Sequence, residues 1–151
     1  MNIVKVLRNS ELTHGLTDSE IEALSGLFHS RHIARDETIF KEGEPSEELY
    51  IIAKGRVSVV IYSTAQAGER EKIATLRDNE LFGEFSLIDS SPRSASVTAD
   101  ENTDLIFVDN VAFHRHLTAN EHCGYLIMRN IAKILTGKLR KTNFELRNAI
   151  L

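Results

Sequence analysis

The spacing of hydrophobic residues changes twice along the chain and divides it into three segments, residues 1–36, 37–109 and 110–151. In the first segment, apolar residues recur at helical intervals after Thr17 and Glu20, which have the spacing of a capping box and predict a short helix. In the second, short β-branched runs alternate with turn signals, and in the third the helical spacing returns. The pattern therefore predicts a single domain in which helices flank a set of short strands.

The middle segment contains several runs with strand character, which are TIF, LYIIA, RVSVVIY, KIATL, SASVTA and DLIFV. Turn signals separate them at EGEPS, AKG, TAQAGER and RDNE. Strands so short, with no long helix between them, favour an antiparallel sandwich or barrel over a parallel sheet. Val57, Val59 and Ile61 alternate with their neighbours and indicate one better-buried strand face. The expected fold class is mainly β: an antiparallel, jelly-roll-like β-roll, followed by a short helix and a long C-terminal helix.

Two helix caps begin the last segment. Asp109 or Asn110 can cap a short helix that runs through Leu117, and Asn120 can cap a long helix that continues toward Leu151. On a helical wheel, the apolar residues of the long helix share one broad face, and they are Ile127, Ile131, Ile134, Leu135, Leu139, Leu146 and Ile150. This stripe is longer than one β-roll can cover, so we expect two such helices to pair in a homodimer.

Composition narrows the class of protein. The chain has 151 residues, 42% of them hydrophobic and 26% charged, as in an ordinary globular domain. Its net charge of −4 gives no overall basic field, so we expect neither direct DNA binding nor attachment to an anionic membrane. No stretch approaches the roughly 18 continuous apolar residues of a membrane span, and the first residues lack the features of a secretory signal. We therefore expect a cytoplasmic protein.

The stretch FGEFSLIDSSPRSASV, residues 82–97, places Glu84 and Arg93 among apolar and small residues. Its SLI portion can form one helical turn, whose first backbone amides point outward and suit an anion. Gly83 lets the backbone approach a ligand closely, and Arg93 supplies a planar fork that can hold two oxygens of one phosphate. Glu84 offers only acceptors, which suit a sugar hydroxyl. These groups are typical of a nucleotide site, and the alternative is a structural ion pair between Glu84 and Arg93.

Two long motifs resemble the cyclic nucleotide-binding domains of the catabolite activator protein and of the protein kinase A regulatory subunit. FKEGEPSEELYIIAKGRVSVV is similar to the early strands of that family, with matches at Gly43, Tyr50, Ile52, Gly55 and Val57. FGEFSLIDSSPRSA, residues 82–95, is similar to its phosphate-binding cassette, including the eight residues between the glutamate and the arginine. Asn79 stands where the family usually has a turn glycine, and asparagine tolerates the left-handed conformation better than most residues. The resemblance covers nearly the whole chain.

The resemblance implies a role for each matching residue. Glu84 would accept a hydrogen bond from the ribose 2′-hydroxyl, Arg93 would bind the cyclic phosphate, and Ser94 would lie beside the phosphate or the base. On the long helix, Thr142 and Asn143 would reach the purine, partly across a dimer seam. The implied ligand-binding residues are Gly83, Glu84, Phe85, Ser86, Arg93, Ser94, Ala95, Thr142 and Asn143. In the family a threonine after the cassette arginine often favours cyclic GMP, so Ser94 leads us to expect a preference for cyclic AMP.

The resemblance also implies a receptor or regulatory domain rather than an enzyme, with no metal or other cofactor, that signals by ligand-coupled movement of the C-terminal helix. Transcription factors of this superfamily carry a helix-turn-helix after the long helix, and the sequence up to Leu151 contains none. We therefore expect its output to pass through a partner protein or an effector domain on a longer chain. The second-ranked alternative is a haem or redox sensor of the same superfamily, although Cys123 alone cannot hold an iron–sulfur cluster.

A cupin-type metalloenzyme is the more distant alternative. His114, His116 and Glu121 match the spacing of a cupin His-x-His and glutamate motif. These residues lie in the predicted helical segment rather than on strands, and Val108 and Met128 stand where cupins have flanking glycines. The context therefore disfavours a metal site at these residues.

Overall fold

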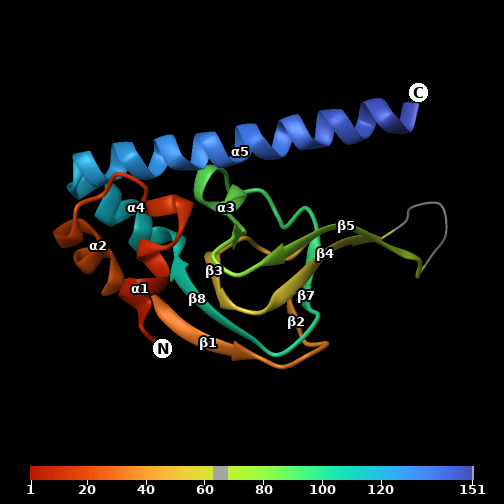
Figure 1. Ribbon diagram of the computed structural model, residues 1–151, viewed down its shortest axis with the longest axis horizontal. Helices are drawn as coiled ribbons and strands as arrows, with labels where there is room; N and C mark the ends of the chain where they lie inside the picture. Colours follow the sequence, from red (N-terminus) through yellow and green to blue (C-terminus); the bar gives the residue numbers. More distant parts are fainter. Residues whose placement is uncertain (63–67, 151) are drawn as a thin grey trace.

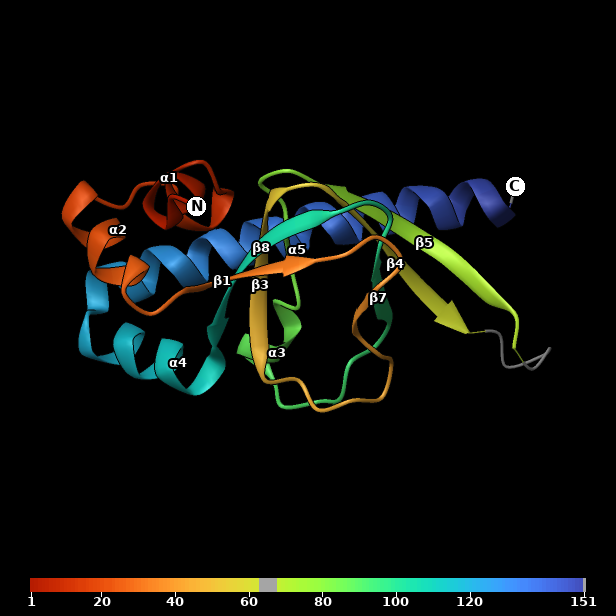
Figure 2. The same ribbon diagram turned by 90° about the horizontal axis from the view of Figure 1, so that it is seen from below.

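The computed structural model describes residues 1–62 and 68–150, and Figures 1 and 2 show it from two directions. In chain order its elements are α1 (Ile3–Arg8), η1 (Glu11–Thr13), α2 (Asp18–Ser25), β1 (His29–Ile33), β2 (Thr38–Phe40), β3 (Glu48–Lys54), β4 (Arg56–Tyr62), β5 (Arg70–Arg77), β6 (Leu81–Phe82), α3 (Phe85–Ile88), β7 (Ser96–Ala99), β8 (Thr103–Asp109), α4 (Asn110–Ala119) and α5 (Glu121–Ile150). The predicted fold class is confirmed. The predicted turn at 64–70 falls largely outside the described residues, as does Leu151.

The roll consists of two four-stranded antiparallel sheets, with strand orders β1-β8-β3-β6 and β2-β7-β4-β5. A shared core lies between them, and its buried residues are Ile33, Ile39, Tyr50, Ile52, Val57, Leu76, Phe82, Val97, Ala99 and Leu105. Successive side chains of a strand point to opposite faces, so β3 sends Tyr50 and Ile52 into this core, whereas Leu49 and Ile51 point away from it. The roll therefore needs a second layer on the outer face of its first sheet.

Helices supply that second layer. At one end of the molecule, α1, α2 and α4 gather against the first sheet, and α5 runs along the whole length of the fold (Figure 1). Their common core includes Leu7, Leu12, Ile21, Leu24, Phe28, Leu49, Ile51, Ile106, Val108, Phe113, Leu117 and Ile127. The first third of α5 is thereby fixed to the body of the domain.

The N-terminal segment differs in part from its prediction. The capping box of Thr17 and Glu20 is present, with reciprocal hydrogen bonds of 3.2 and 3.0 Å at the start of α2. The predicted helical segment 1–36, however, contains a strand, because β1 pairs along its length with β8. Only Ile33 of β1 is buried, so this strand carries no apolar run that marks it in the sequence.

The predicted alternation of β4 is only partly present. Val57 is buried and Val59 is half-buried, and both pack into the core between the two sheets. Val60 is buried as well and Ile61 only half-buried, so the two faces of β4 differ less in burial than predicted. The pairing of β4 with β5 contains a bulge, and its extra residue is Ile73 of β5.

The caps of the last two helices are partly as expected. Asp109 caps α4 by accepting a 2.9 Å hydrogen bond from the amide of Ala112. Asn120 instead donates its side-chain amide to the carbonyl of His116, and so bonds to the end of α4. Every residue of α5 from 139 to 150 is exposed. None of the described helices combines the length and the hydrophobicity of a membrane span.

Candidate functional site

The cassette predicted at residues 82–95 is a sharp turn followed by one helical turn. Gly83 follows β6 with a φ of 76°, a left-handed conformation that glycine adopts without strain. Ser86 in α3 then donates its hydroxyl to the carbonyl of Gly83, at 2.6 Å, and to that of Glu48, at 3.3 Å. These bonds fix the cassette against β3.

Close packing requires the glycine at position 83. A Cβ added there would lie 2.8 Å from Nη1 of Arg93 and 3.0 Å from the carbonyl oxygen of Glu48. Both distances are shorter than ordinary van der Waals contact, so any side chain at this position would displace the arginine or the strand. Gly83 thus brings Arg93 against the cassette backbone.

Arg93 is a buried cation held by neutral groups. Its side chain donates from Nη2 to the carbonyl of Glu48 at 2.8 Å and from Nη1 to that of Gly83 at 3.4 Å, and the residue is 7% exposed. Within the described parts of the chain, Arg93 forms no salt bridge and its buried Nε has no hydrogen-bond partner. Desolvation lowers the pKa of Arg93, and the nearby Tyr50 and Glu48 oppose this effect. A buried guanidinium with a free donor is suited to bind an anion.

Aromatic rings form the floor beneath this arginine. Its Cζ lies 4.0 Å from the centroid of Phe40, close enough for a cation–π interaction. Tyr50 and Phe82 stack beside it with centroids 5.0 Å apart. Tyr50 also donates its hydroxyl to Glu48 at 2.8 Å, and burial is the main cause that raises its pKa well above the ordinary value. The arginine is therefore oriented by rigid neighbours before any ligand contact.

Glu84 and Arg93 do not form the ion pair considered as the structural alternative. The Glu84 side chain is 3% exposed and pairs instead with Lys138 of α5, whose Nζ lies 2.5 Å from Oε1. The two charges of the cassette thus remain separate, as a site for a phosphate and a hydroxyl requires.

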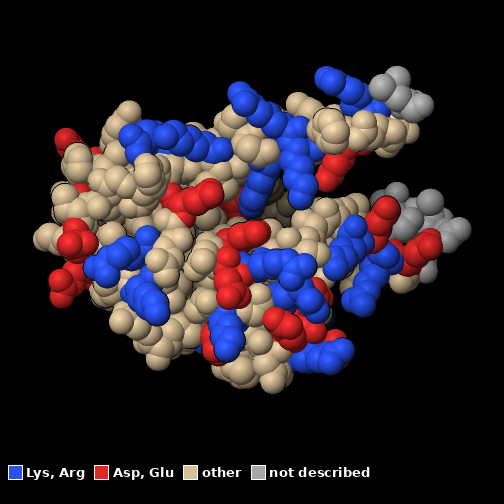
Figure 3. Space-filling model, viewed as in Figure 1, with Lys and Arg blue, Asp and Glu red and all other residues tan. Residues whose placement is uncertain are grey.

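Lys138 contacts the cassette and was not among the residues predicted for the site. The signal was its position seven residues after Ile131, which puts it on the same helical face as a buried residue. Figure 3 shows Lys and Arg side chains along α5, some of them directed from its C-terminal half toward the roll.

The other predicted site residues differ in burial and in their distance along the chain from the cassette. Ala95 is buried beside the arginine, whereas Ser94 and Phe85 are exposed. Thr142 and Asn143 lie on α5 beyond Lys138, and both are exposed. The structure thus brings the cassette residues together and leaves the two purine-contacting candidates outside the cluster.

A metal centre is not apparent in the described residues, where no group of three or more His, Cys, Asp or Glu side chains is placed to hold an ion. The cupin candidates His114 and His116 lie on α4, and Nε2 of His114 bonds to the carbonyl of Leu87. His114 thus connects α4 to α3 and has a structural partner.

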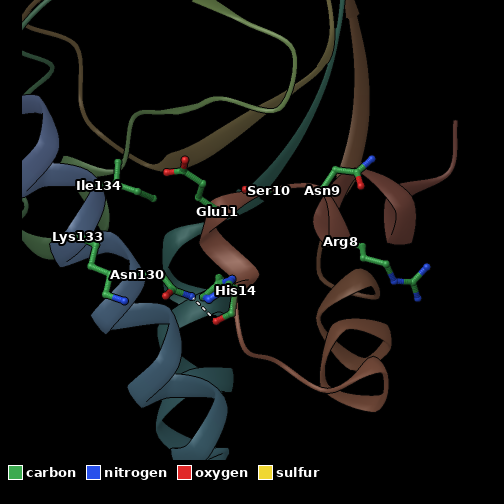
Figure 4. A pocket seen from close by; sticks show the side chains of 8 residues that line it. All are labelled: Arg8, Asn9, Ser10, Glu11, His14, Asn130, Lys133 and Ile134. Atoms are coloured by element: carbon green, nitrogen blue, oxygen red, sulfur yellow. Dashed lines mark hydrogen bonds between the residues drawn. The ribbon is translucent and has the colours of Figure 1, made fainter.

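A separate hollow of about 390 Å³ lies between the N-terminal segment and α5 (Figure 4). It is lined by Arg8, Asn9, Ser10, Glu11, His14, Asn130, Lys133 and Ile134. Asn130 is buried at its edge and donates to the carbonyls of Leu12, at 2.8 Å, and His14, at 2.9 Å. This hollow contains none of the cassette residues. Asn130 at its edge connects α5 to the N-terminal segment.

Comparison with known proteins identifies the family of this arrangement. Residues 30–120 match the family described as "Cyclic nucleotide-binding domain". The chain is 34% identical over 143 residues to the "Cyclic AMP receptor protein" of Thermus thermophilus, and the match covers 93% of this chain and 62% of that protein. The solved Thermus thermophilus Catabolite Activator Protein has a TM-score of 0.79 and 31% identity, over 91% of this chain and 62% of that one. A cyclic nucleotide-binding domain from Methylobacillus flagellatus has a TM-score of 0.86 at 24% identity, over 99% of this chain and 83% of that one, and supports the fold.

Proposed function

Because the chain belongs to the cyclic nucleotide-binding domain family, we propose that it is a regulatory domain that binds a cyclic mononucleotide, preferably cyclic AMP, at residues 82–95. The chain spans 62% of the length of the Thermus receptor protein that it matches. We therefore propose this function for the domain alone, whose signal would pass to a partner protein or to an effector domain.

The burial of Arg93 without a partner of opposite charge in the described residues is the main support for this function. A buried guanidinium without a salt bridge in the described residues, with a free Nε, is best satisfied by an anionic oxygen. Glu84, on the other side of Gly83, is an acceptor for a ribose hydroxyl. The pair suits a ligand that carries one phosphate and one hydroxyl at a fixed separation, as a cyclic ribonucleotide does.

The preference for cyclic AMP rests on Ser94 and on α5. Ser94 lacks the methyl group of the threonine that favours cyclic GMP in the family, and Thr142 and Asn143 can accept from an adenine amino group. Both α5 residues are exposed in the structure. We therefore propose that α5 moves toward the bound nucleotide, or that the α5 of a second chain supplies these contacts. Ligand-coupled movement of α5 would be the signal.

We also propose that the protein is a homodimer and that it is cytoplasmic. The exposed apolar residues of the last part of α5, which include Leu139, Leu146 and Ile150, suit a homodimer that pairs two α5 helices. The net charge of −4 does not favour direct DNA contact by this domain. We propose a cytoplasmic regulator without catalytic activity of its own.

A redox sensor is the alternative on the same fold, and the environment of Cys123 weighs against it. The thiol is buried, and desolvation, with a smaller contribution from Glu20, raises its pKa to about 11. Redox-sensing cysteines are accessible and have a low pKa, because the thiolate is the reactive form.

Calorimetric titration with cyclic AMP, cyclic GMP and linear AMP tests the proposal. We expect the tightest binding for cyclic AMP and the weakest for linear AMP. We also expect Thr142→Ala and Asn143→Ala to reduce the preference for cyclic AMP over cyclic GMP. Absence of binding by both cyclic nucleotides would refute the function, and equal affinities for the two would refute the base preference alone.

A further inference from the structure

A second hollow, of about 370 Å³, lies on the second sheet and contains none of the cassette residues. We call it the second-sheet hollow, and it is lined by Arg35, Asp36, Arg56, Lys72, Thr75, Arg77 and Asp100. We propose that it binds a short chain of linked phosphoryl groups, as in inorganic tripolyphosphate. This inference goes beyond the proposed function and does not depend on the binding of a cyclic nucleotide.

The floor of the second-sheet hollow is the outer face of β4 and β5. Val57 and Leu76 lie opposite each other and point into the core between the sheets. The adjacent Arg56 and Arg77 therefore point outward, and so does Thr75, two residues before Arg77. The second sheet lies on the side of the molecule away from α1, α2 and α4 (Figures 1 and 2).

A row of hydroxyl groups crosses this outer face and ends in the hollow. The strand register places Thr38 of β2 opposite Thr98 of β7, and Thr98 opposite Ser58 of β4. Ser58 in turn lies opposite Thr75 of β5, which lines the hollow. Hydroxyl groups can donate hydrogen bonds to phosphoryl oxygens. The outer face of the sheet is thus polar across all four strands.

Two arginines face each other at this floor. Arg56 is paired directly with Arg77, and like charges in opposite positions of two strands are destabilising. Asp100 relieves only Arg56: its carboxylate lies 3.4 Å from Nε of Arg56 and accepts from the Ser58 hydroxyl at 2.7 and 2.8 Å. Arg77 forms no salt bridge within the described residues. Its charge is therefore left uncompensated by the fold.

The rim of the hollow adds two more cations. Arg35 and Lys72 also take part in no salt bridge in the part of the chain that the structure describes. The lining holds four cations and two carboxylates, and so has an excess of two positive charges in a chain whose net charge is −4. The planar fork of an arginine can bind two oxygens of one phosphoryl group. A polyanion in the hollow would thus remove the repulsion between its cations.

The side chains of the lining also limit the chemical class of the ligand. Its described residues are charged, apart from one threonine, and include no apolar or aromatic side chain. A nucleobase or a peptide would bring apolar surface, for which small-molecule sites usually provide apolar walls. A chain of phosphoryl groups has no such surface. The volume lies in the range of small-molecule sites, roughly 300 to 1,000 Å³, and gives room for more than one phosphoryl group.

Calorimetric titration with inorganic tripolyphosphate tests the site. We expect Arg77→Thr to lower the affinity at least tenfold, because charge-assisted hydrogen bonds are lost. The matched control is Arg70→Thr, which removes the same charge from an exposed position on β5 outside the hollow. Screening by salt weakens the effect of distant exposed charges, so the control should change the affinity less than about threefold. Equal losses in the two variants, or unchanged binding by Arg77→Thr, would overturn the inference.

Competing ligands test the location and the class of the ligand. An excess of cyclic AMP should not displace tripolyphosphate, and displacement would assign the anion to the cassette instead. Inorganic phosphate should bind more weakly than tripolyphosphate, because it reaches fewer of the cations. ATP carries the same chain on a nucleoside and should bind no more tightly than tripolyphosphate. Tighter binding of ATP, or equal binding of inorganic phosphate, would overturn the proposed ligand class.

Thermal unfolding without ligand distinguishes a binding role of Arg77 from a structural one. Arg77→Thr removes a like-charge pair and introduces a residue that favours strands, so its melting temperature should be unchanged or higher. A lower melting temperature together with unchanged affinity for tripolyphosphate would show that Arg77 serves the fold. If the unmodified chain does not bind tripolyphosphate, the inference fails, whether or not cyclic AMP binds.

Discussion

Arg93 lies over the ring of Phe40, with its guanidinium carbon 4.0 Å from the ring centroid. The ring and two backbone carbonyls hold the arginine in place without neutralising its charge. This arrangement differs from a structural salt bridge, in which a carboxylate would occupy the anion position. The positive charge therefore remains available to a phosphate.

Arg93→Ala should lower the affinity for cyclic AMP by roughly ten- to a hundredfold, because it removes charge-assisted hydrogen bonds in a partly desolvated site. Arg93→Lys keeps the charge but loses the planar fork, so its affinity should be intermediate. Calorimetric titration measures both, and circular dichroism checks that the variants are folded. An affinity unaffected by Arg93→Ala in a folded protein would contradict the site assignment.

Gly83→Ala should lower the affinity for cyclic AMP in addition to the stability of the fold. Alanine at a φ of 76° is strained by about 1 kcal/mol, and its Cβ would also press on Arg93, 2.8 Å away. The matched control is Gly68→Ala, where φ is also left-handed, at 86°, and among the described residues, chain neighbours aside, none comes within 4 Å of the added Cβ. Both variants should lose stability in thermal unfolding, Gly83→Ala more than the control, and only Gly83→Ala should lose affinity. Similar affinities for the two would show that the close packing at Gly83 is not needed for binding.

The apolar stripe of α5 should hold a dimer together. Leu146→Glu places a charge in the stripe, so light scattering at tens of micromolar protein should change from a dimeric to a monomeric mass. Asn148→Glu adds the same charge on the opposite face of the helix and should leave the dimer intact. A monomeric mass for the unmodified chain would place no interface on α5.

The thiol of Cys123 should be unreactive in the native protein. Its pKa rises from the ordinary 9.0 to about 11, mainly through burial, so almost no thiolate exists at pH 8. A chromogenic disulfide reagent should therefore react slowly with the folded chain and rapidly after unfolding. The unfolded thiol ionises near pH 9, so this group stabilises the fold below pH 9, and the contribution is lost as the pH rises through 11. Fast reaction of the folded chain at pH 8 would favour the redox alternative.

The sequence allowed the roll and the cassette to be predicted because their signals are local. Gly83 and the short turn of α3 follow from residue types that suit one backbone shape. Asn79 adopts a φ of 73°, the left-handed conformation expected for asparagine in place of the family's glycine. The backbone conformation at such positions can be predicted from the residue type alone.

The missed features depend on distant partners. The strand β1 contains mostly exposed residues and exists because it pairs with β8, which is far along the chain. The bulge at Ile73 of β5, opposite Val59 and Val60, is a property of the strand pairing and leaves no mark in the hydrophobic pattern. Lys138 meets Glu84 across 54 residues of sequence, so its spacing indicated only a helical face and no partner.

Asn130 anchors α5, because its two bonds to the N-terminal segment fix the helix at that point. With a rise of about 1.5 Å per residue, Lys138 lies roughly 12 Å from this anchor and Ile150 roughly 30 Å from it. If the helix turned there as a rigid body by about 10°, Lys138 would move by about 2 Å and Ile150 by about 5 Å. The length of the exposed part of α5 would thus more than double, at its end, any displacement at Lys138.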